Sequence, residues 1–422
     1  MSEVRTVEAD SAPPQARPSI EQIESADLVV GILADLSPDE VTEVCDALRT
    51  LPGKPRIVVL QNSAANASPE VSEAAEQDSA LSLLPWPVDV QNATAAPVES
   101  ALAAYQSIFS VGDRLGVRGC CIIASKLEHA PSKWVCRLTE PLLVPDFDFV
   151  APCYARRKFE GLLNNGIISP LTRSLYGKRI QNPMGPDLGI SQRLLGRILA
   201  GDRNGKAGGG GMHLLASLVP KAVCENLLVC QAYLGARIYP PMDWTDVSSL
   251  LTEILGPVFL AMEKNAACWQ RTRTSSPVVA LNEPLPVMQT TAIVDIARMV
   301  NSFQLGNRDL QEIWGLVLPP ATLLDIRKLS RLAPEQFQFP DELWVRIIYD
   351  FALAYHLRTI NRDHLLRSLT PLYLGWVAAY ARELETAEAA EIEQRLERLS
   401  LAYETGKPYL VSRWRWPDRF NP

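Results

Sequence analysis

The stretch ADLVVGILADLSPDEVTEVCDALRTL, residues 26–51, constrains the fold more than any other part of the chain. An apolar run over 27–33 predicts a buried strand, which a short polar loop follows. The segment SPDE at 37–40 then supplies an N-cap residue, a first-turn proline and early acids, so it predicts the start of a helix. A second apolar run at 55–63 predicts another buried strand. Strand, helix and strand in this order favour a parallel sheet with a right-handed crossover.

The alternation of strands and helices continues along the next hundred residues and predicts an α/β class. Apolar residues at helical spacing cover 98–116, a buried strand is expected at 120–123, and 145–155 predicts a further strand. We interpret 64–96 as a long loop or irregular insertion, because it is polar and alanine-rich and shows no clear period.

Two later regions differ from this pattern. The segment GDRNGKAGGGGMH at 201–213 does not match a phosphate-binding loop, because its lysine precedes the glycines, so it favours a flexible loop. From about residue 245 the chain is predicted to be mostly helical, with core-facing apolar stripes at 341–360 and 387–404. The first stripe indicates core packing and consists of Trp344, Ile348, Phe351 and Tyr355. Trp414 and Trp416 favour a packed C-terminal tail, and a lid over the preceding domain is the alternative.

Charge and hydropathy argue against two classes of partner. The 41 basic and 48 acidic residues give a net charge of −7, which disfavours nucleic acid. No uninterrupted apolar run reaches the ~18 residues needed to span a bilayer, so no membrane span is expected. Residues 1–25 are polar, lack the apolar core of a signal peptide, and are expected to form a disordered tail.

The eight cysteines include no CxxC pair, which argues against a zinc ribbon or a thioredoxin motif. Several lie inside apolar runs, so we expect buried thiols in a reducing cytosol and a cytoplasmic location. With only four histidines in the chain, a site built from several of them is not expected.

The most informative stretch is YARRKFEGLLNNGIISPLTRSLYGKRIQNPMGPDLGIS, residues 154–191. It combines a basic and aromatic cluster, an Asn-Asn pair, the block PLTRSLYGKRI and the loop GPDLGIS. This combination resembles the GT-A nucleotide-sugar glycosyltransferases of the glucosylglycerate and mannosylglycerate synthase type, whose relatives make glucosyl-3-phosphoglycerate. Further blocks that look like this family lie at 229–238, 365–380 and 407–414, so the resemblance covers nearly the whole chain after about residue 26.

The resemblance implies a GT-A, Rossmann-like glycosyltransferase domain at 26–270 and a helical C-terminal extension at 271–422. It also implies transfer of a hexose from a nucleotide donor to glycerate or a similar small hydroxy acid. Such enzymes hold Mg²⁺ or Mn²⁺ through an Asp-x-Asp motif at a strand end, often with a later histidine. The cation neutralises the diphosphate leaving group in the transition state.

At these positions the chain departs from the family pattern. Ala124, Ser125 and Lys126 stand where the Asp-x-Asp motif is expected, and Tyr239 stands where the histidine is expected. A phenol is a poor ligand for these cations near neutral pH, because its reference pKa is about 10. We therefore predict no metal ligands, although the family implies Mg²⁺ or Mn²⁺. Either the ammonium of Lys126 replaces the cation at the diphosphate, or Lys126 is a solvated residue in a site that has lost its activity.

The remaining candidate site residues come from the family block. Asp187 matches an acid of the family and could act as a base or bind a sugar hydroxyl, or it could form an Asx turn. Candidates for binding donor or acceptor are Arg156, Arg157, Lys158, Asn164, Asn165, Thr172 and Arg173. The alternative for the three bases, Arg156 to Lys158, is that they form a solvated surface. The alternative for the other four residues is that they pack the helix that follows. His129, close to the same strand end, is more simply explained as a structural or solvated residue.

Two functional hypotheses remain. The first is a divergent glycosyltransferase that works without Asp-x-Asp, with catalytic roles for Asp187 and Lys126, and that binds a nucleotide-sugar and a small hydroxy-acid acceptor. The second is a catalytically inactive pseudo-glycosyltransferase that acts as a binding or partner subunit. Two assemblies fit these hypotheses, a homo-oligomer and an association with an active relative.

Overall fold

The computed structural model describes residues 20–62, 80–86, 97–125, 131–144, 146–155, 157–203, 211–237, 244–283 and 294–417. Most of the predicted N-terminal tail and most of the predicted insertion lie outside these ranges. Lys126, His129, Arg156 and Tyr239 also lie outside them, so the roles expected for Lys126 and Arg156 stay predictions.

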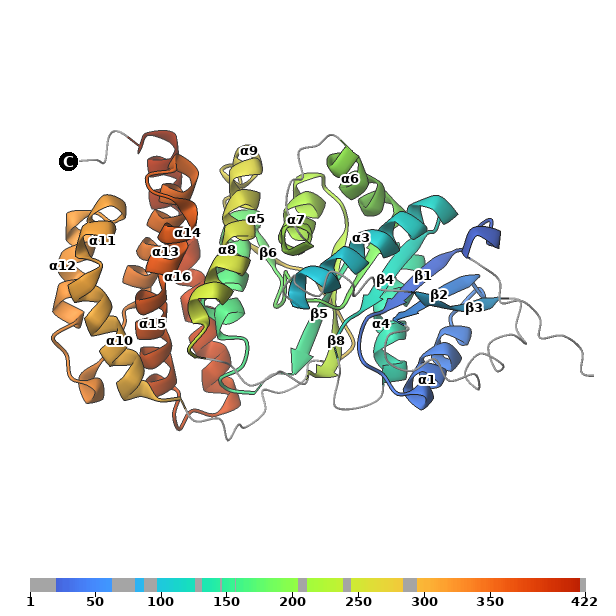
Figure 1. Ribbon diagram of the computed structural model, residues 1–422, viewed down its shortest axis with the longest axis horizontal. Coiled ribbons are helices and arrows are strands. Elements are labelled where there is room, and N and C mark those ends of the chain that lie inside the picture. Colours follow the sequence, from blue (N-terminus) through green and yellow to red (C-terminus); the bar gives the residue numbers. More distant parts are fainter. Residues whose placement is uncertain are drawn as a thin grey trace, which may run out of the picture.

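An eight-stranded mixed sheet forms the centre of one half of the molecule (Figure 1). Its strand order is β10-β8-β5-β7-β4-β1-β2-β3, and every neighbouring pair is parallel except the two that β7 makes with β4 and β5. The strands are β1 (Leu28–Ile32), β2 (Ile57–Asn62), β3 (Leu81–Trp86), β4 (Gly119–Ile123), β5 (Phe149–Ala155), β7 (Leu188–Ser191), β8 (Val229–Ala236) and β10 (Val279–Leu281). The predicted α/β class is confirmed.

Helices cover both faces of this sheet. Successive residues of a strand point to opposite sides, so a continuous apolar strand presents an apolar surface on each face. Cys120 and Ile122 of β4 belong to one apolar cluster, and Cys121 and Ile123 belong to the other. The first cluster includes residues of α3 (Pro97–Leu115), α6 (Gln192–Arg203) and α7 (Gly211–Cys224). The second includes residues of α1 (Pro38–Arg49) and α4 (Pro131–Leu143). Both cores are therefore built from continuous apolar strands.

The start of α1 shows how a few neighbouring residues determine where this helix begins. Ser37 caps the helix by accepting a hydrogen bond from the backbone N–H of Glu40, whose side chain accepts one from Ser37 in return. Pro38 occupies the first turn, where its missing N–H costs nothing. The predicted strand, helix and strand over 26–63 are confirmed.

Two strands of the sheet were missed by the sequence analysis. The interpretation of 64–96 as a loop fails at 81–86, where β3 pairs in parallel with β2 at the edge of the sheet. This short strand contains Pro85, which an edge position tolerates and which hides the strand pattern. The four residues of β7 were likewise not predicted to form a strand.

The other half of the molecule is helical, as expected for the sequence after residue 245 (Figure 1). It contains α8 (Val247–Lys264), α9 (Ala266–Trp269), α10 (Ile296–Asp309), α11 (Gln311–Val317), α12 (Pro320–Leu329), η4 (Pro334–Gln336), α13 (Asp341–Leu357), α14 (Arg362–Ser368), α15 (Thr370–Glu383) and α16 (Ala389–Arg415). The remaining short elements are η1 (Ile20–Gln22), β6 (Lys178–Arg179) and β9 (Ser276–Pro277).

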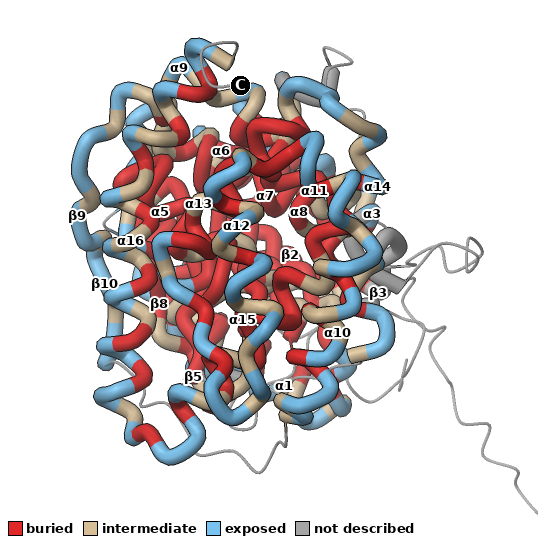
Figure 2. The backbone as a smooth tube through the Cα atoms, turned by 90° about the vertical axis from the view of Figure 1, so that its left-hand side faces the viewer, coloured by how far each residue is buried: buried red, intermediate tan, exposed pale blue. Residues whose placement is uncertain are grey.

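One apolar core runs through the helical half, and its buried residues line the inner turns in Figure 2. The predicted stripe from Trp344 to Tyr355 lies in this core, with all four side chains buried. The same cluster includes the π-helical turn η3 (Asn164–Ile168) and α5 (Ser169–Tyr176), which come from the middle of the chain. The core therefore crosses the expected domain boundary near residue 270, and that boundary stays a prediction.

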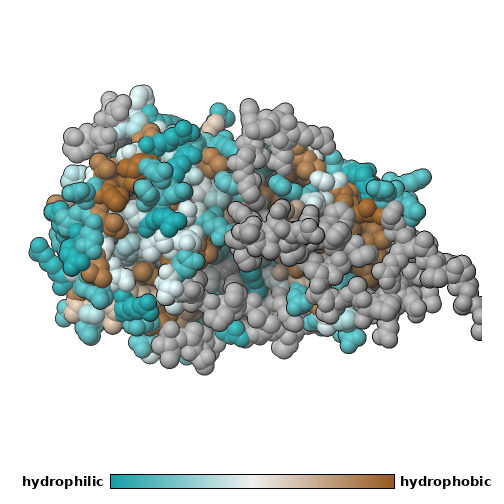
Figure 3. All heavy atoms as spheres, in the orientation of Figure 1, coloured by the Kyte–Doolittle hydropathy of each residue, from teal (hydrophilic) through white to brown (hydrophobic). Residues whose placement is uncertain are grey.

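The surface shown in Figure 3 mixes hydrophilic and hydrophobic residues over the helical end of the molecule. In the described part of the chain, no helix combines the length and the apolar character that crossing a bilayer requires.

Candidate functional site

A cleft of about 490 Å³ opens where the sheet meets the helical half. Tyr154, at the carboxyl end of β5, and Gln231 and Tyr233 of β8 form its sheet side. Residues of α16 and of α5 form its helical side. Ligands of open α/β sheets usually bind outside the carboxyl ends of the strands. The cleft is therefore the candidate binding site.

Both signs of charge line this cleft. Arg157, Lys158, Arg173 and Arg179 bring cationic groups, and α16 brings the carboxylates of Glu393 and Glu397. Three of the four cationic residues were predicted from the family block, and the structure places them at one cleft. Arg179 and the two glutamates were not predicted.

Arg173 is held by two carboxylates of α16. Its Nε donates to Glu404 at 2.5 Å, and its Nη2 donates to Glu397 at 2.8 Å. Burial alone would lower the pKa of Arg173, but the hydrogen bonds from its guanidinium to Glu397 and Glu404 reverse this and raise it. The Arg173 hydrogen bond lowers the pKa of Glu397 in turn. Arg173 therefore fixes α16 against α5 and keeps Glu397 ionised at the cleft.

The two neighbouring bases are also engaged by the protein. The buried ammonium of Lys158 donates to the carbonyl oxygen of Glu385 at 2.8 Å. The guanidinium of Arg157 donates to Glu160 at 3.2 Å. Arg179 lies on the exposed side of the cleft and donates to Ser275 Oγ at 3.1 Å. Arg157 and Arg179 are therefore more accessible to an anion than Lys158.

The Asn-Asn pair lies on η3, a π-helical turn of a kind that often occurs at functional sites. Asn165 lines the cleft. Asn164 instead donates to the carbonyl oxygen of Gln181 at 2.9 Å and does not line it. Thr172 is buried beside a separate internal cavity of about 20 Å³. Neither Asn164 nor Thr172 is therefore brought to the cleft.

Asp187 lies in the core at the tip of β4. Its Oδ1 accepts the backbone N–H groups of Ala124 and Ser125 at 2.8 and 2.9 Å. Its Oδ2 accepts the hydroxyl of Tyr154 at 2.5 Å, and the side chain is fully buried. The carboxylate reaches the cleft only through Tyr154. The arrangement stabilises the strand tip, and the catalytic role expected for Asp187 stays a prediction.

Several cleft residues carried a signal that the sequence analysis missed. Gln231 and Tyr233 stand two residues apart in an otherwise apolar strand, so they point to the same side of the sheet. Glu393 and Glu397 stand four residues apart on one face of α16. The sequence could not show that this face of α16 and β8 line the same cleft.

The described residues do not fit the divalent cation that the resemblance implies. Within the ranges described above, no group of three or more His, Cys, Asp or Glu side chains could hold a metal ion. At the tip of β4, Ala124 and Ser125 have no carboxylate, and both oxygens of Asp187 already accept hydrogen bonds.

Comparison with solved structures finds many similar chains, including the following three proteins. The first is glucosyl-3-phosphoglycerate synthase from Mycobacterium tuberculosis, with 15% identity over 58% of this chain and 85% of that chain, and a TM-score of 0.37. The second is mannosyl-3-phosphoglycerate synthase from Rubrobacter xylanophilus, with 14% identity over 61% and 78% of the two chains, and a TM-score of 0.35. The third is a mycobacterial protein, with 16% identity over 60% and 80%, and a TM-score of 0.35. No family model and no curated protein matches the chain.

Proposed function

We propose that the chain is a divergent glycosyltransferase that binds a small hydroxy acid in the cleft between β5, β8 and α16 and transfers a hexose to it without a divalent cation. The observation that carries the proposal is the composition of this one cleft. Guanidinium groups of Arg157 and Arg179 and carboxylates of Glu393 and Glu397 line it at the carboxyl edge of the sheet.

Each charged group has a task that suits a hydroxy acid. A guanidinium binds a carboxylate through two parallel hydrogen bonds, and Arg157 and Arg179 supply such groups. Ionised carboxylates only accept hydrogen bonds, so Glu393 and Glu397 would accept the ligand hydroxyls. Asn165 and Gln231 add amide groups at the same cleft. A ligand with one carboxylate and neighbouring hydroxyls satisfies both sides.

The donor side of the proposal uses cationic side chains. By the resemblance, a diphosphate would bind at the tip of β4. Lys126 stands shortly after this strand in the sequence, and Arg156 directly follows β5. We assign charge neutralisation of the leaving group to these two residues, in place of a cation. In this scheme Asp187 orients the strand tip through Ala124 and Ser125 and holds the hydroxyl of Tyr154.

A binding protein without transferase activity is the second candidate. One observation favours it, because the acid that matches the family block is fully buried and accepts three hydrogen bonds. A carboxylate in that state has no direct path to a substrate. The protein would then keep the cleft as a binding or partner subunit.

Calorimetric titration with glycerate and 3-phosphoglycerate tests the cleft. Arg179→Ala removes an exposed cleft guanidinium and should weaken binding about tenfold or more, the effect of losing a charge-assisted hydrogen bond. Arg308→Ala on α10 is the matched control, because that arginine is exposed and does not line the cleft. Equal affinities of both variants and the wild type would exclude the cleft as the site.

Transfer is tested separately with UDP-glucose and GDP-mannose, each with and without Mn²⁺. Sugar appearing on glycerate in the absence of Mn²⁺ supports the transferase. Glycerate binding with no product from either donor supports the binding protein instead.

A further inference from the structure

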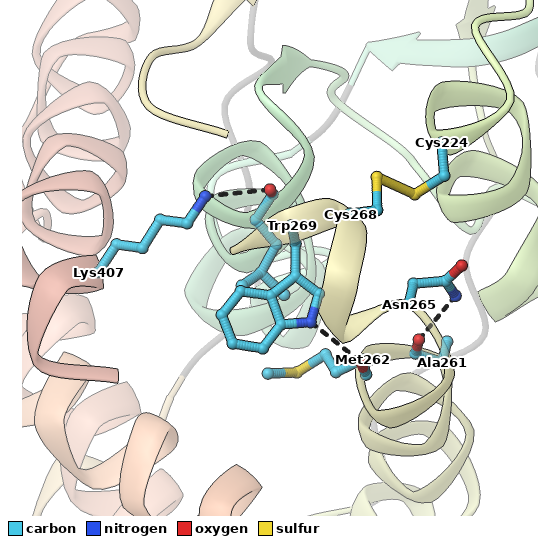
Figure 4. Close-up of a disulfide and its surroundings, with 8 residues drawn as sticks. Cys224, Ala261, Met262, Asn265, Cys268, Trp269 and Lys407 are labelled. Atoms are coloured by element: carbon cyan, nitrogen blue, oxygen red, sulfur yellow. Dashed lines mark hydrogen bonds between the residues drawn. A yellow bond between two sulfur atoms is a disulfide. The ribbon is translucent and has the colours of Figure 1, made fainter. Parts of the chain in front are cut away.

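The structure contains one disulfide, between Cys224 at the end of α7 and Cys268 in α9, among the cysteines it describes. Their Cα atoms lie 5.8 Å apart, and 44 residues separate them in the sequence. The sequence did not predict this pair. The expectation of several buried thiols holds for Cys45, Cys120, Cys121, Cys153 and Cys230. The bond joins a helix of the sheet half to the beginning of the helical half (Figure 4).

The disulfide differs from the five buried cysteines in its access to solvent. Cys224 and Cys268 are both partly exposed. Burial raises the pKa of Cys45 to about 11 and of Cys230 to about 12, so these thiols stay protonated and unreactive. Cys136 is also partly exposed, and burial raises its pKa too. Of the three partly exposed cysteines, Cys224 and Cys268 are therefore the two that lie close enough to form a reversible bond.

The turn that follows Cys268 is bound to α16. Figure 4 shows Cys268, Trp269 and Lys407 around this turn. Three contacts connect it to the last turns of α16: the rings of Trp269 and Trp414 at 5.2 Å, Arg415 Nε donating to Gln270 Oε1 at 2.7 Å, and Lys407 Nζ donating to the carbonyl oxygen of Thr272 at 2.8 Å. The position of the turn therefore bears on the position of α16.

The same segment then forms a wall of the cleft. A few residues after the turn, β9 pairs with β6, and Pro277, Val278 and Ala280 line the cleft. α16 contributes a second wall with Glu393 and Glu397. Two walls of one cleft thus converge on the turn that the disulfide anchors to α7.

We propose that Cys224 and Cys268 form a reversible thiol–disulfide site that controls ligand binding in the cleft. The oxidised pair holds the segment 268–281 and α16 in the arrangement that binds ligand, and reduction releases the segment from α7. The effect on binding rests on the proposed function of the cleft. The effect on the segment does not.

Glutathione disulfide is a sufficient oxidant for closing the bond. The thiolate of one cysteine attacks a sulfur of glutathione disulfide, forms a mixed disulfide and releases one glutathione thiolate. The thiolate of the other cysteine then attacks the protein sulfur of the mixed disulfide, and a second glutathione thiolate leaves. The two cysteines lose two electrons and two protons, and one glutathione disulfide becomes two glutathione molecules.

Equilibration of the full chain in glutathione buffers of graded potential tests the site. Alkylation followed by mass spectrometry should show Cys224 and Cys268 titrating together, with Cys136 alkylated at every potential. Independent titration of the two cysteines, or a bond that never forms, would overturn the proposal.

Hydrogen exchange tests the coupling in the oxidised and reduced wild type, so that a misfolding variant cannot confuse the result. Reduction should speed exchange of amides in 268–281 and in the last turns of α16 by about tenfold, as expected when a local opening becomes easier. Cys268→Ser should reproduce the reduced state under oxidising conditions, and Cys136→Ser should leave exchange unchanged. Identical exchange in both redox states would overturn the coupling.

Glycerate titration of the two redox states completes the test. Reduction should weaken binding by roughly fivefold or more, the lower end of coupling between sites. Faster exchange without any glycerate binding in either state would support the redox control of the segment and overturn the proposed ligand. Faster exchange with equal affinity in both states would overturn the control of binding.

Discussion

At the scale of single residues, buried charged side chains connect elements that lie far apart in the chain. Lys407 is buried, and its ammonium donates to the carbonyl oxygens of Ser174, Leu175 and Thr272 at 2.7, 3.1 and 2.8 Å. The first two lie in the last turn of α5, where helix carbonyls lack partners within the helix. Burial lowers the pKa of Lys407 to about 8. A cation of α16 therefore caps α5.

Lys407→Met tests this cap because methionine keeps the length of the side chain and removes the donors. We expect a loss of about 1–3 kcal/mol in the free energy of unfolding, since three buried carbonyls lose a partner. Urea denaturation measures the loss. The control is Lys328→Met on α12, whose side chain is 75% exposed, and an equal effect of both changes would contradict the cap.

Asp148 joins three segments at the start of β5. Its Oδ1 accepts from Ser191 at 2.6 Å and Arg193 at 2.7 Å, and its Oδ2 accepts the backbone N–H of Leu228 at 2.9 Å. Burial alone would raise the pKa of Asp148, but these hydrogen bonds lower it below its ordinary value of 3.8. Because the pKa of Asp148 is lower in the folded than in the unfolded state, its ionised carboxylate stabilises the fold at pH values above the unfolded-state pKa. This stabilisation is lost as the pH falls through the folded-state pKa.

Asp148→Asn should therefore make the free energy of unfolding depend less steeply on pH in the acid range. Urea denaturation between pH 6 and pH 2 should show the wild type losing stability below about pH 4, with a shallower slope in the variant. Asp146→Asn is the control, because Asp146 also pairs with Arg193 but its side chain is 59% exposed. A wild-type slope in Asp148→Asn would contradict the assignment.

At the scale of elements, the π-helical turn η3 is held by the C-terminal helices. The carbonyl oxygen of Gly166 accepts the indole N–H of Trp344 and the hydroxyl of Tyr403, both at 2.9 Å. Trp376 packs directly on this glycine and is stacked on Trp344 at 5.5 Å. Asn165 reaches the cleft from this turn, so helices far along the chain position a cleft residue.

Gly166→Ala tests the close packing on η3. A Cβ at this position would lie 2.5 Å from two ring atoms of Trp376, which has little room to move. We expect a loss of about 1–3 kcal/mol of stability from overpacking. Gly196→Ala in α6 is the matched control, because nothing lies within 4 Å of the added Cβ, and it should stabilise the chain by about 0.5–1 kcal/mol. Thermal unfolding of both variants would show whether the signs differ as expected.

At the scale of the whole molecule, elements from the middle of the chain belong to the core of the C-terminal helices. Buried residues of η3, α5 and α8 pack in the same cluster as those of α13, α15 and α16. Arg173 and Lys407 reinforce this contact with bonds between α5 and α16. The net charge of −7 affects solubility more than fold.

A chain shortened after residue 270 should therefore fail to fold. The truncation removes the helices that cover α5 and α8 and exposes buried residues such as Leu255 and Trp269. We expect loss of the near-ultraviolet circular dichroism signal and aggregation on expression. A soluble fragment with a cooperative thermal transition would show instead that the sheet half folds without the helical half.

The predictable part of the fold is the part that local sequence decides. The strand over Leu28–Ile32, the cap at Ser37 and the stripe from Trp344 to Tyr355 all follow from residues close together in the chain. β3 was missed because an edge strand with a proline lacks a clear period. Of the predicted site residues, Arg157, Lys158, Asn165 and Arg173 line the cleft, whereas Asn164 and Thr172 from the same stretch do not.

The sequence alone determined the α/β class, the helical C-terminal region and the location of the most informative block, because periodicity and capping act within a few residues. Only the tertiary structure decided that Glu397 and Glu404 hold Arg173, that Asp187 holds the tip of β4, and that Cys224 bonds Cys268. Arg173 and Glu397 are separated by 224 residues, and Asp187 and Ala124 by 63. Partners at such separations meet through the packing of whole elements, which no local pattern encodes.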